Sequence, residues 1–441
     1  MKIGFVSLGC AKNLVDTEVM LKILTDAGYE ITPEDTEADV IIVNTCGFIQ
    51  SAKEEAIENI LDVAWLKKHK NLKGIIATGC LVERYREEIL REMPEVDAAL
   101  GTGSYHKIAE AVAAVARGEK YTSFEDKDKA PLGGERVLTT PDYTAYLKIA
   151  EGCDNRCTYC AIPLIRGRMR SRTIEDLVAE AKNLEDLGVK ELNLIAQDTT
   201  RYGLDLYGRY MLPELIRAIC RETNIPWIRL LYLYPDKMTD ELIAEIRDND
   251  RVCKYVDLPI QHINDRVLAR MNRHGGSDIV RDAVRRVRAE IPDVTLRTTV
   301  IVGFPGESED EFAELCEFIK EMKFDRLGAF AYSPEEGTAA ADYPDQIDEQ
   351  VKQDRCDAVM RVQLGVSEAA MQEKIGRTLT VLCEGYDAAA GVQFGRSAAD
   401  APDVDGKIYF TAKKKLPAGV FVQVKITEAL DYDLFGEAEQ K

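Results

Sequence analysis

Apolar runs typical of β-strands alternate with helix-like segments over most of this 441-residue chain. In the first 130 residues, three such runs occupy residues 3–8, 40–45 and 74–78. Strands that alternate with helices predict a parallel sheet, and open parallel sheets bind ligands at the carboxyl ends of their strands. We therefore predict an N-terminal α/β domain with a parallel sheet over residues 1–130.

Each of these three apolar runs leads directly to a cysteine. Cys10, Cys46 and Cys80 follow the first, second and third run. Because the carboxyl ends of parallel strands meet at one edge of the sheet, the three thiols are expected to lie together there. The alternative is three unrelated buried thiols that serve only in packing.

The rest of the chain divides into three further regions. A charged segment rich in Gly and Pro, which we place at residues 131–141, predicts a linker. About six strand–helix units follow over residues 142–370 and predict a full or partial parallel (β/α) barrel. Alternating apolar runs at 378–382, 407–410 and 419–426 predict a small antiparallel β-barrel over residues 371–441.

A second group of cysteines follows the first strand of the central region. Cys153, Cys157 and Cys160 lie within eight residues. Thiolates suit zinc or iron-sulfur clusters, and three of them without a nearby fourth cysteine leave one metal valence open. A structural zinc site normally closes with four ligands, so the spacing favours a metal site whose open valence allows chemistry. The alternative is a chance group of thiols that serve in packing.

Polar side chains also stand at the predicted carboxyl ends of central strands. Gln197 and Asp198 follow the second strand and Gln261 follows the fourth, while Ile301 lies near the end of the fifth. Their positions make them candidates for cofactor contacts.

Composition limits the compartment and the partners. The formal charge of -20 repels phosphate backbones and favours basic partners. Residues 371–441 carry 9 Lys and Arg against 11 Asp and Glu, which makes direct nucleic-acid binding by the small barrel doubtful. No run approaches the roughly 18 apolar residues of a membrane span, and no export signal precedes the first strand. We expect a cytoplasmic protein without membrane contact, whose 11 cysteines bind metal or pack rather than form disulfides.

The Cys153-x-x-x-Cys157-x-x-Cys160 motif, with Tyr159 before its last cysteine, resembles the cluster motif of radical S-adenosylmethionine (SAM) enzymes. The sequences around Cys10, Asn44-Thr45-Cys46 and Gly79-Cys80 are similar to those of the radical SAM methylthiotransferases. The resemblance covers essentially the whole chain. It implies an N-terminal methylthiotransferase domain, a radical SAM barrel and a C-terminal TRAM barrel of the OB-like type.

The resemblance also implies the cofactors and their ligands. Cys153, Cys157 and Cys160 are expected to hold one 4Fe-4S cluster, which binds SAM, and Cys10, Cys46 and Cys80 a second, whose open iron carries sulfur. Tyr159 joins Gln197, Asp198, Gln261 and Ile301 as a candidate cofactor-binding residue. No side chain is assigned a separate catalytic role, because the clusters and the radical perform the chemistry.

Residues 7–16 and 431–436 resemble the branch of the family that modifies a ribosomal protein. The implied reaction is methylthiolation of the β-carbon of an aspartate in the twelfth protein of the small ribosomal subunit, free or in the ribosome. A low-potential electron donor such as flavodoxin or ferredoxin is the expected second partner. Two alternatives stay open: a tRNA (adenosine) methylthiotransferase with the same chemistry, and a non-catalytic iron-sulfur electron carrier.

Overall fold

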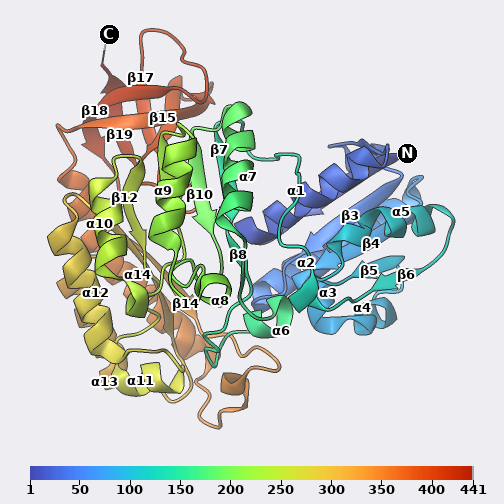
Figure 1. The fold of residues 1–441 in the computed structure, drawn as a ribbon. Coiled ribbons are helices and arrows are strands. Elements are labelled where there is room, and N and C mark those ends of the chain that lie inside the picture. Colours follow the sequence, from blue (N-terminus) through green and yellow to red (C-terminus); the bar gives the residue numbers. More distant parts are fainter. Residues whose placement is uncertain (440–441) are drawn as a thin grey trace.

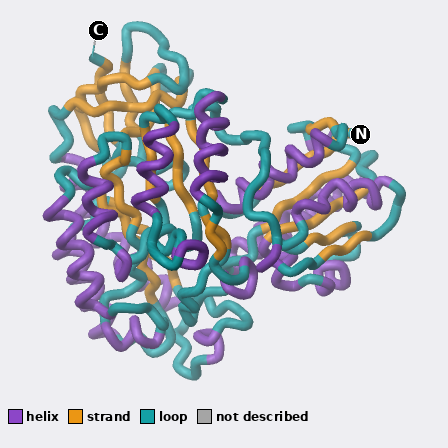
Figure 2. Tube along the Cα trace, viewed as in Figure 1, coloured by secondary structure: helices purple, strands orange, loops and turns teal. Residues whose placement is uncertain are grey.

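The computed structural model describes residues 1–439, and it contains three β structures that follow one another along the chain (Figure 1). A six-stranded sheet comes first, a second six-stranded sheet follows, and a five-stranded closed barrel comes last. Figure 2 shows helices along the outer side of the second sheet and the barrel strands stacked over one end of it. Residues 440 and 441, the last two of the region predicted as a small barrel (371–441), lie outside the described residues.

The first sheet is entirely parallel. Its strands and the helices around it are β1 (Lys2–Ser7), α1 (Ala11–Asp26), β2 (Glu30–Ile31), β3 (Val40–Thr45), α2 (Gln50–His69), β4 (Gly74–Gly79), α3 (Cys80–Tyr85), α4 (Glu87–Glu92), β5 (Ala98–Leu100), α5 (Ile108–Ala116) and β6 (Tyr121–Ser123). The strand order is β2-β1-β3-β4-β5-β6. Every residue of β3 and β4 is buried, as inner strands covered on both faces require. The predicted parallel sheet is confirmed.

The central sheet is an open, parallel, partial barrel. Its elements are β7 (Thr144–Lys148), β8 (Ala150–Glu151), α6 (Ile162–Arg166), β9 (Arg170–Ser171), α7 (Ile174–Asp186), β10 (Glu191–Ile195), α8 (Leu204–Tyr207), α9 (Leu212–Glu222), β11 (Trp227–Leu230), α10 (Asp240–Asp248), β12 (Val252–Asp257), α11 (Asp265–Arg270), α12 (Gly276–Glu290), β13 (Thr295–Val302), α13 (Glu309–Met322), β14 (Arg326–Ala331) and α14 (Glu349–Gln372). The order is β14-β13-β12-β11-β10-β7, with β8 and β9 forming a separate pair. Within residues 1–439, the edge strands β7 and β14 do not pair with each other.

The C-terminal barrel closes in the order β15-β16-β17-β19-β18. Its strands are β15 (Thr378–Asp387), β16 (Val392–Ser397), β17 (Ile408–Thr411), β18 (Phe421–Ala429) and β19 (Leu434–Ala438). The predicted small barrel is thus present, antiparallel except for the parallel pair β17–β19. The apolar pattern located β15, β17 and β18. It did not reveal β16, which contains Gly395 and Arg396, or β19, which follows an acidic stretch.

The barrel is anchored to the central sheet by a buried ion triad. Glu191, at the start of β10, accepts from Arg229 of β11 at 2.8 Å and from Arg396 of β16 at 2.6 Å. The three side chains are at most 2% exposed. A buried carboxylate is stable only when it is fully paired, so this triad fixes how the barrel is placed.

Two segments from outside the central sheet fill its inner face. Ala401, in the loop between β16 and β17, and Val15 of α1 pack in one apolar cluster with Tyr146 and Tyr255. The Tyr255 hydroxyl also donates a 2.6 Å hydrogen bond to Asp405 of the same loop. The outer helices cover the opposite face, where alternate strand residues such as Leu147 belong to another cluster. All three β structures are therefore packed into one body.

Within residues 1–439, no helix has both the length and the apolar composition that crossing a membrane would require.

The ion triad yields a stability prediction. Arg396→Met should lower the free energy of unfolding by about 3–5 kcal/mol, because it leaves the buried Glu191 with one guanidinium and removes the ion pair of Arg396 with Glu384. Trp227 lies 4.8 Å from Phe421 of β18, ring centre to ring centre, so its fluorescence reports on barrel docking. The measurement is urea unfolding in a Trp65→Phe background, which leaves Trp227 as the single tryptophan. Arg377→Met, which removes an exposed pair with Asp293, should cost at most about 1 kcal/mol; an equal cost would refute the anchoring role.

The same triad makes docking acid-sensitive. Burial opposes ionisation of Glu191, but Arg229 and Arg396 outweigh it and lower the pKa of Glu191 to about 2. A carboxyl whose pKa is lower in the folded state stabilises that state above its unfolded pKa of about 4.5, and loses this effect as the pH falls towards 2. The difference in unfolding free energy between the wild type and Glu191→Gln should therefore shrink across that window, as measured by urea unfolding at each pH.

Candidate functional site

The first group of thiols lies on the loop between β8 and α6. The Cys153 N–H donates to the carbonyl of Gly167 at 3.1 Å, and the Cys160 N–H donates to the carbonyl of Cys157 at 3.0 Å. Gly152 has φ +78°, and a Cβ there would lie 2.0 Å from the carbonyl oxygen of Arg168. Only glycine fits this backbone, so the tight loop that presents the thiols depends on it.

The environment of these thiols disfavours free thiolates. Burial, together with the nearby Asp198 and Cys157, raises the pKa of Cys153 to about 11. Burial and the neighbouring Cys157 and Cys153 also raise the pKa of Cys160. With their pKa values raised in this way, Cys153 and Cys160 need a positively charged partner to ionise near neutral pH, and a metal cluster supplies it. The donor set therefore fits an iron-sulfur cluster.

The second group of thiols lies at the carboxyl ends of three neighbouring strands. Cys10 follows β1, Cys46 follows β3 and Cys80 begins α3 directly after β4. A Cβ at Gly9 would lie 3.1 Å from the Cys46 sulfur, which shows how closely the first two segments approach. Strand order β1-β3-β4 brings the three segments to one edge, as the sequence pattern predicted.

Charge distinguishes the members of this second group. Burial raises the pKa of Cys80 to about 12 and also raises that of Cys46. The pKa of Cys10 is instead lowered, because Lys12 and Arg166 together outweigh the opposing effect of burial. Arg166 acts on all three thiols. The group is thus a set of mutually interacting sulfurs next to a fixed cation, which also fits an anionic iron-sulfur cluster.

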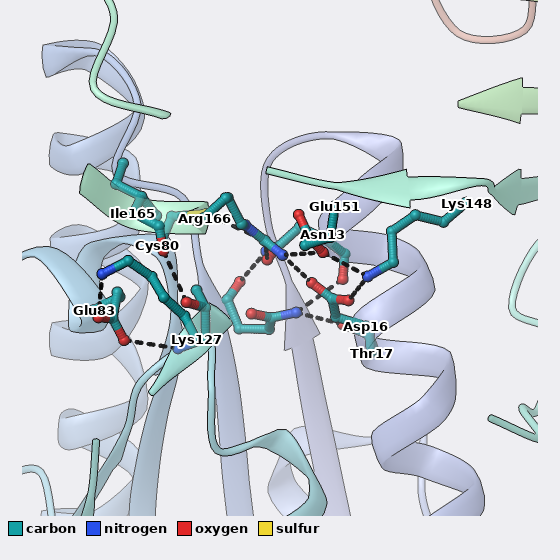
Figure 3. Close-up of polar contacts among 12 residues, drawn as sticks. Asn13, Asp16, Thr17, Cys80, Glu83, Lys127, Lys148, Glu151, Ile165 and Arg166 are labelled. Carbon is teal, nitrogen blue, oxygen red and sulfur yellow. Dashed lines mark hydrogen bonds and ion pairs between the residues drawn. The ribbon is translucent and has the colours of Figure 1, made fainter. Parts of the chain in front are cut away.

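Arg166, the last residue of α6, reaches from the segment after the first thiol loop to Cys80 of the second group (Figure 3). Its guanidinium donates to the Cys80 sulfur at 3.3 Å, to the Asn13 side-chain oxygen at 3.0 Å and to Asp16 at 2.5 Å. It also lies 3.3 Å from Glu151. A single side chain that follows the first thiol loop therefore contacts a thiol of the second group.

Lys148 completes this arrangement. Its ammonium pairs with Asp16 and lies 2.8 Å from Glu151, and the Gln197 amide donates to Glu151 at 2.8 Å. Burial works against ionisation of Glu151, but Lys148 and Arg166 lower its pKa below the usual range. Two cations and two carboxylates thus form a buried network without net charge. We call Asp16, Lys148, Glu151 and Arg166 the interdomain network.

The other predicted cofactor residues lie around the first thiol loop. Asp198 accepts a 2.7 Å hydrogen bond from Asn155 of that loop. Gln261, at φ +71°, exchanges backbone hydrogen bonds with the β13 strand, including one at 2.8 Å from the Ile301 N–H. Tyr159 and Ile301 belong to one apolar cluster. The structure therefore brings Tyr159, Gln261 and Ile301 together on one side and Gln197 and Asp198 on the other.

Sequence reasoning missed several charged residues of the site. The sequence assigned no role to Lys12, Asp16, Lys148, Glu151 or Arg166. One signal was available: Lys148 lies inside an apolar strand run. Because a charged side chain is rarely buried without a partner, this lysine predicts a buried ion pair. Arg273 was also missed; its guanidinium lies 3.8 Å from the ring centre of Tyr234, whose hydroxyl is 3.6 Å from the Cys157 sulfur.

Within residues 1–439, no group of Cys, His, Asp or Glu side chains surrounds a single metal-ion position. This is compatible with a cluster, because the thiolates of an iron-sulfur cube bind different irons and do not converge on one ion.

Comparison with known proteins decides the family. The model of the Radical SAM superfamily matches residues 147–319, that of the uncharacterized protein family UPF0004 matches 2–101, and that of the TRAM domain matches 375–438. A ribosomal protein uS12 methylthiotransferase RimO from Lachnoclostridium phytofermentans is 50% identical over 440 residues, with 100% of both chains covered. Its counterpart from Thermoanaerobacter sp. (strain X514) is 49% identical over 436 residues, 99% of each chain. The chain belongs to the RimO family.

RimO membership makes the protein a radical SAM methylthiotransferase that uses SAM and 4Fe-4S chemistry. The fold agrees. The radical SAM methyltransferase TsrM from Kitasatospora setae superposes with a TM-score of 0.56 at 13% identity, covering 88% of this chain and 79% of TsrM. At that identity the likeness concerns the fold alone.

The interdomain network leads to the third prediction. Arg166→Met should weaken docking of the first sheet on the central sheet by about 3–5 kcal/mol, because it leaves two buried carboxylates with one lysine. Hydrogen exchange of α1 and α6 amides should rise in this variant. Arg168→Met, at an exposed neighbouring position, is the matched control and should leave exchange unchanged. Equal protection of α1 in both variants would contradict the linking role of Arg166.

Proposed function

We propose that this enzyme transfers a methylthio group to the β-carbon of an aspartate in ribosomal protein uS12. The observation that carries the proposal is full-length similarity to relatives whose names specify that substrate. The formal charge of -20 supports it, because an acidic enzyme attracts a basic ribosomal protein and repels tRNA. The contact of Arg166, which follows the first thiol loop, with Cys80 of the second group supports a two-cluster reaction.

We assign one 4Fe-4S cluster to each thiol group: the first to Cys153, Cys157 and Cys160, the second to Cys10, Cys46 and Cys80. When bound, the first cluster and SAM supply the radical that activates a carbon, and the second supplies the sulfur. The protein positions these groups and excludes water. Cys80 and Cys157 are buried, Cys46, Cys153 and Cys160 are half-buried, and Cys10 is exposed, so each thiol group has one buried member and also borders solvent.

The five predicted cofactor contacts are proposed to hold SAM beside the first cluster. Gln261 and Ile301 border the cluster loop through the apolar group around Tyr159. Gln197 and Asp198 border it through Glu151 and Asn155. The side-chain oxygens of Gln197 and Asn155 are buried without a hydrogen-bond partner in the described residues, so they are available to a ligand's donors.

We propose the domain division 1–130, 131–141, 142–370 and 371–441. The first sheet ends with β6 at Ser123, the central sheet begins with β7 at Thr144, and the barrel begins with β15 at Thr378, which supports these limits. We further propose that the enzyme works in the cytoplasm. There a low-potential donor such as flavodoxin or ferredoxin would supply the electron.

Substrate choice is tested by complementation of a bacterial strain that lacks its own RimO. Expression of this chain should restore the mass increase of one methylthio group on uS12, measured by mass spectrometry of the intact protein and of its aspartate-containing peptide. Bulk tRNA nucleosides are analysed in parallel. New methylthio groups on tRNA with none on uS12 would favour the tRNA-modifying alternative. SAM consumption without either product would favour neither.

The cluster assignment is tested by iron content after anaerobic reconstitution. Replacement of Cys153, Cys157 and Cys160 by Ala should leave about half of the iron, and so should replacement of Cys10, Cys46 and Cys80, because each group is assigned one of two equal clusters. A matched control replaces Cys220, Cys316 and Cys356, three half-buried helix cysteines, and should keep all of the iron. Full iron content in the second variant would contradict the second cluster.

A further inference from the structure

Lys12 is a buried cation without a carboxylate partner. Its side chain belongs to the first turn of α1, two residues after Cys10, and the residue is 7% exposed. The ammonium lies 3.4 Å from the ring centre of Tyr232. Within residues 1–439 it forms no ion pair. Buried charges are normally paired, so an unpaired ammonium at a functional site indicates a missing anion.

The neighbouring carboxylates are already occupied. Asp16 stands four residues after Lys12 on the same helix, the spacing at which Lys and Asp ordinarily pair. Its two oxygens instead contact Lys148 and Arg166. Glu151 is held by the same two cations and by Gln197. Since the interdomain network is neutral, Lys12 adds one positive charge that no carboxylate of residues 1–439 pairs.

Lys12 lies close to both thiol groups. It stands two residues after Cys10 of the second group. Its ring partner Tyr232 accepts a backbone hydrogen bond from the residue after Asp198, and Asp198 accepts one from Asn155 of the first thiol loop. In the proposed reaction the radical and the sulfur must both reach one carbon atom, so an anion held by Lys12 would place that carbon near both groups.

The wall beside Lys12 is rigid. Tyr232 has φ +61°, a conformation that costs energy for a residue with a side chain. Its N–H donates a 2.9 Å hydrogen bond to Asp257, and its carbonyl accepts one of 3.0 Å from the Thr199 N–H. These hydrogen bonds fix the backbone of Tyr232, whose ring lies against the ammonium and favours a positive charge there.

We propose that Lys12 binds the β-carboxylate of the target aspartate and thereby places its β-carbon between the two clusters. The inference rests on the proposed function and names the residue that recognises its substrate. In aspartate the β-carbon is bonded directly to the carboxylate carbon. An ion pair to the carboxylate therefore restricts the reacting carbon to a small volume, which a neutral amide at the same position would not match.

The test compares two synthetic uS12 peptides that differ only in Asp or Asn at the target position. Affinity is measured by fluorescence anisotropy on the reconstituted enzyme without reductant, so that no turnover occurs, and kcat and KM are measured in a second series. The wild type should bind the Asp peptide about 10- to 100-fold more tightly, the usual range for a hydrogen bond to a charged group. Lys12→Met should reduce this ratio to near one and raise KM for the Asp peptide. Lys12→Arg, which keeps the charge, should retain part of the ratio.

Lys22→Met, at a half-buried position of the same helix where the lysine pairs with Asp26, is the matched control and should keep the full ratio. Iron content and the electron paramagnetic resonance signals of Lys12→Met are recorded as well. If Lys12→Met kept the wild-type ratio of Asp-peptide to Asn-peptide affinity, the inference would be overturned. Loss of iron from the second cluster in this variant would also overturn it, because Lys12 would then serve that cluster. Failure of the wild type to modify the Asp peptide, with SAM cleavage intact, would overturn the proposed function and this inference with it.

Discussion

The arrangement of this molecule depends on four charges buried between two domains. Asp16 stands six residues after Cys10, and Arg166 stands six residues after Cys160. Their ion pair, completed by Lys148 and Glu151, thus joins the segments that carry the two thiol groups. A buried charge is costly unless it is paired in good geometry, so few other placements of α1 against the central sheet satisfy all four groups. Electrostatic pairing therefore acts together with the apolar packing of α1 to determine how the first sheet is placed on the central sheet.

Sequence reasoning predicted much of the thiol arrangement because one rule of topology governs it. A cysteine that follows a strand in a parallel sheet lies at the carboxyl edge, whatever the details of packing, and Cys10, Cys46 and Cys80 all obey this rule. Arg166 and Asp16 are 150 residues apart, and no periodic pattern in the sequence indicates that they pair. Lys148 looked like an ordinary residue of an apolar strand. Long-range charge pairs of this kind become visible only when the fold brings the partners together.

The C-terminal barrel shows how net charge can mislead. The loop between β16 and β17 carries Asp400, Asp403 and Asp405, which contribute to the acidic composition. In the fold, Asp400 pairs with Arg326 and Asp405 accepts from Tyr255. These carboxylates help attach the barrel to the inner face of the central sheet instead of forming an acidic outer surface. The barrel thus has a structural role at the amino ends of the strands, away from the edge that carries the thiols.

Charge balance also explains why neighbouring residues at the start of α1 have different partners. Leu14 and Val15 pack in the apolar cluster, Asn13 and Asp16 bind Arg166, and Lys12 has no carboxylate partner. An unpaired buried ammonium lowers stability, and a fold tolerates such a cost where it serves function. The neutral network at its side prevents Asp16 from cancelling the charge. A helix that docks one domain on the other can in this way keep one cation available for a ligand, since docking and recognition use different residues of the same turn.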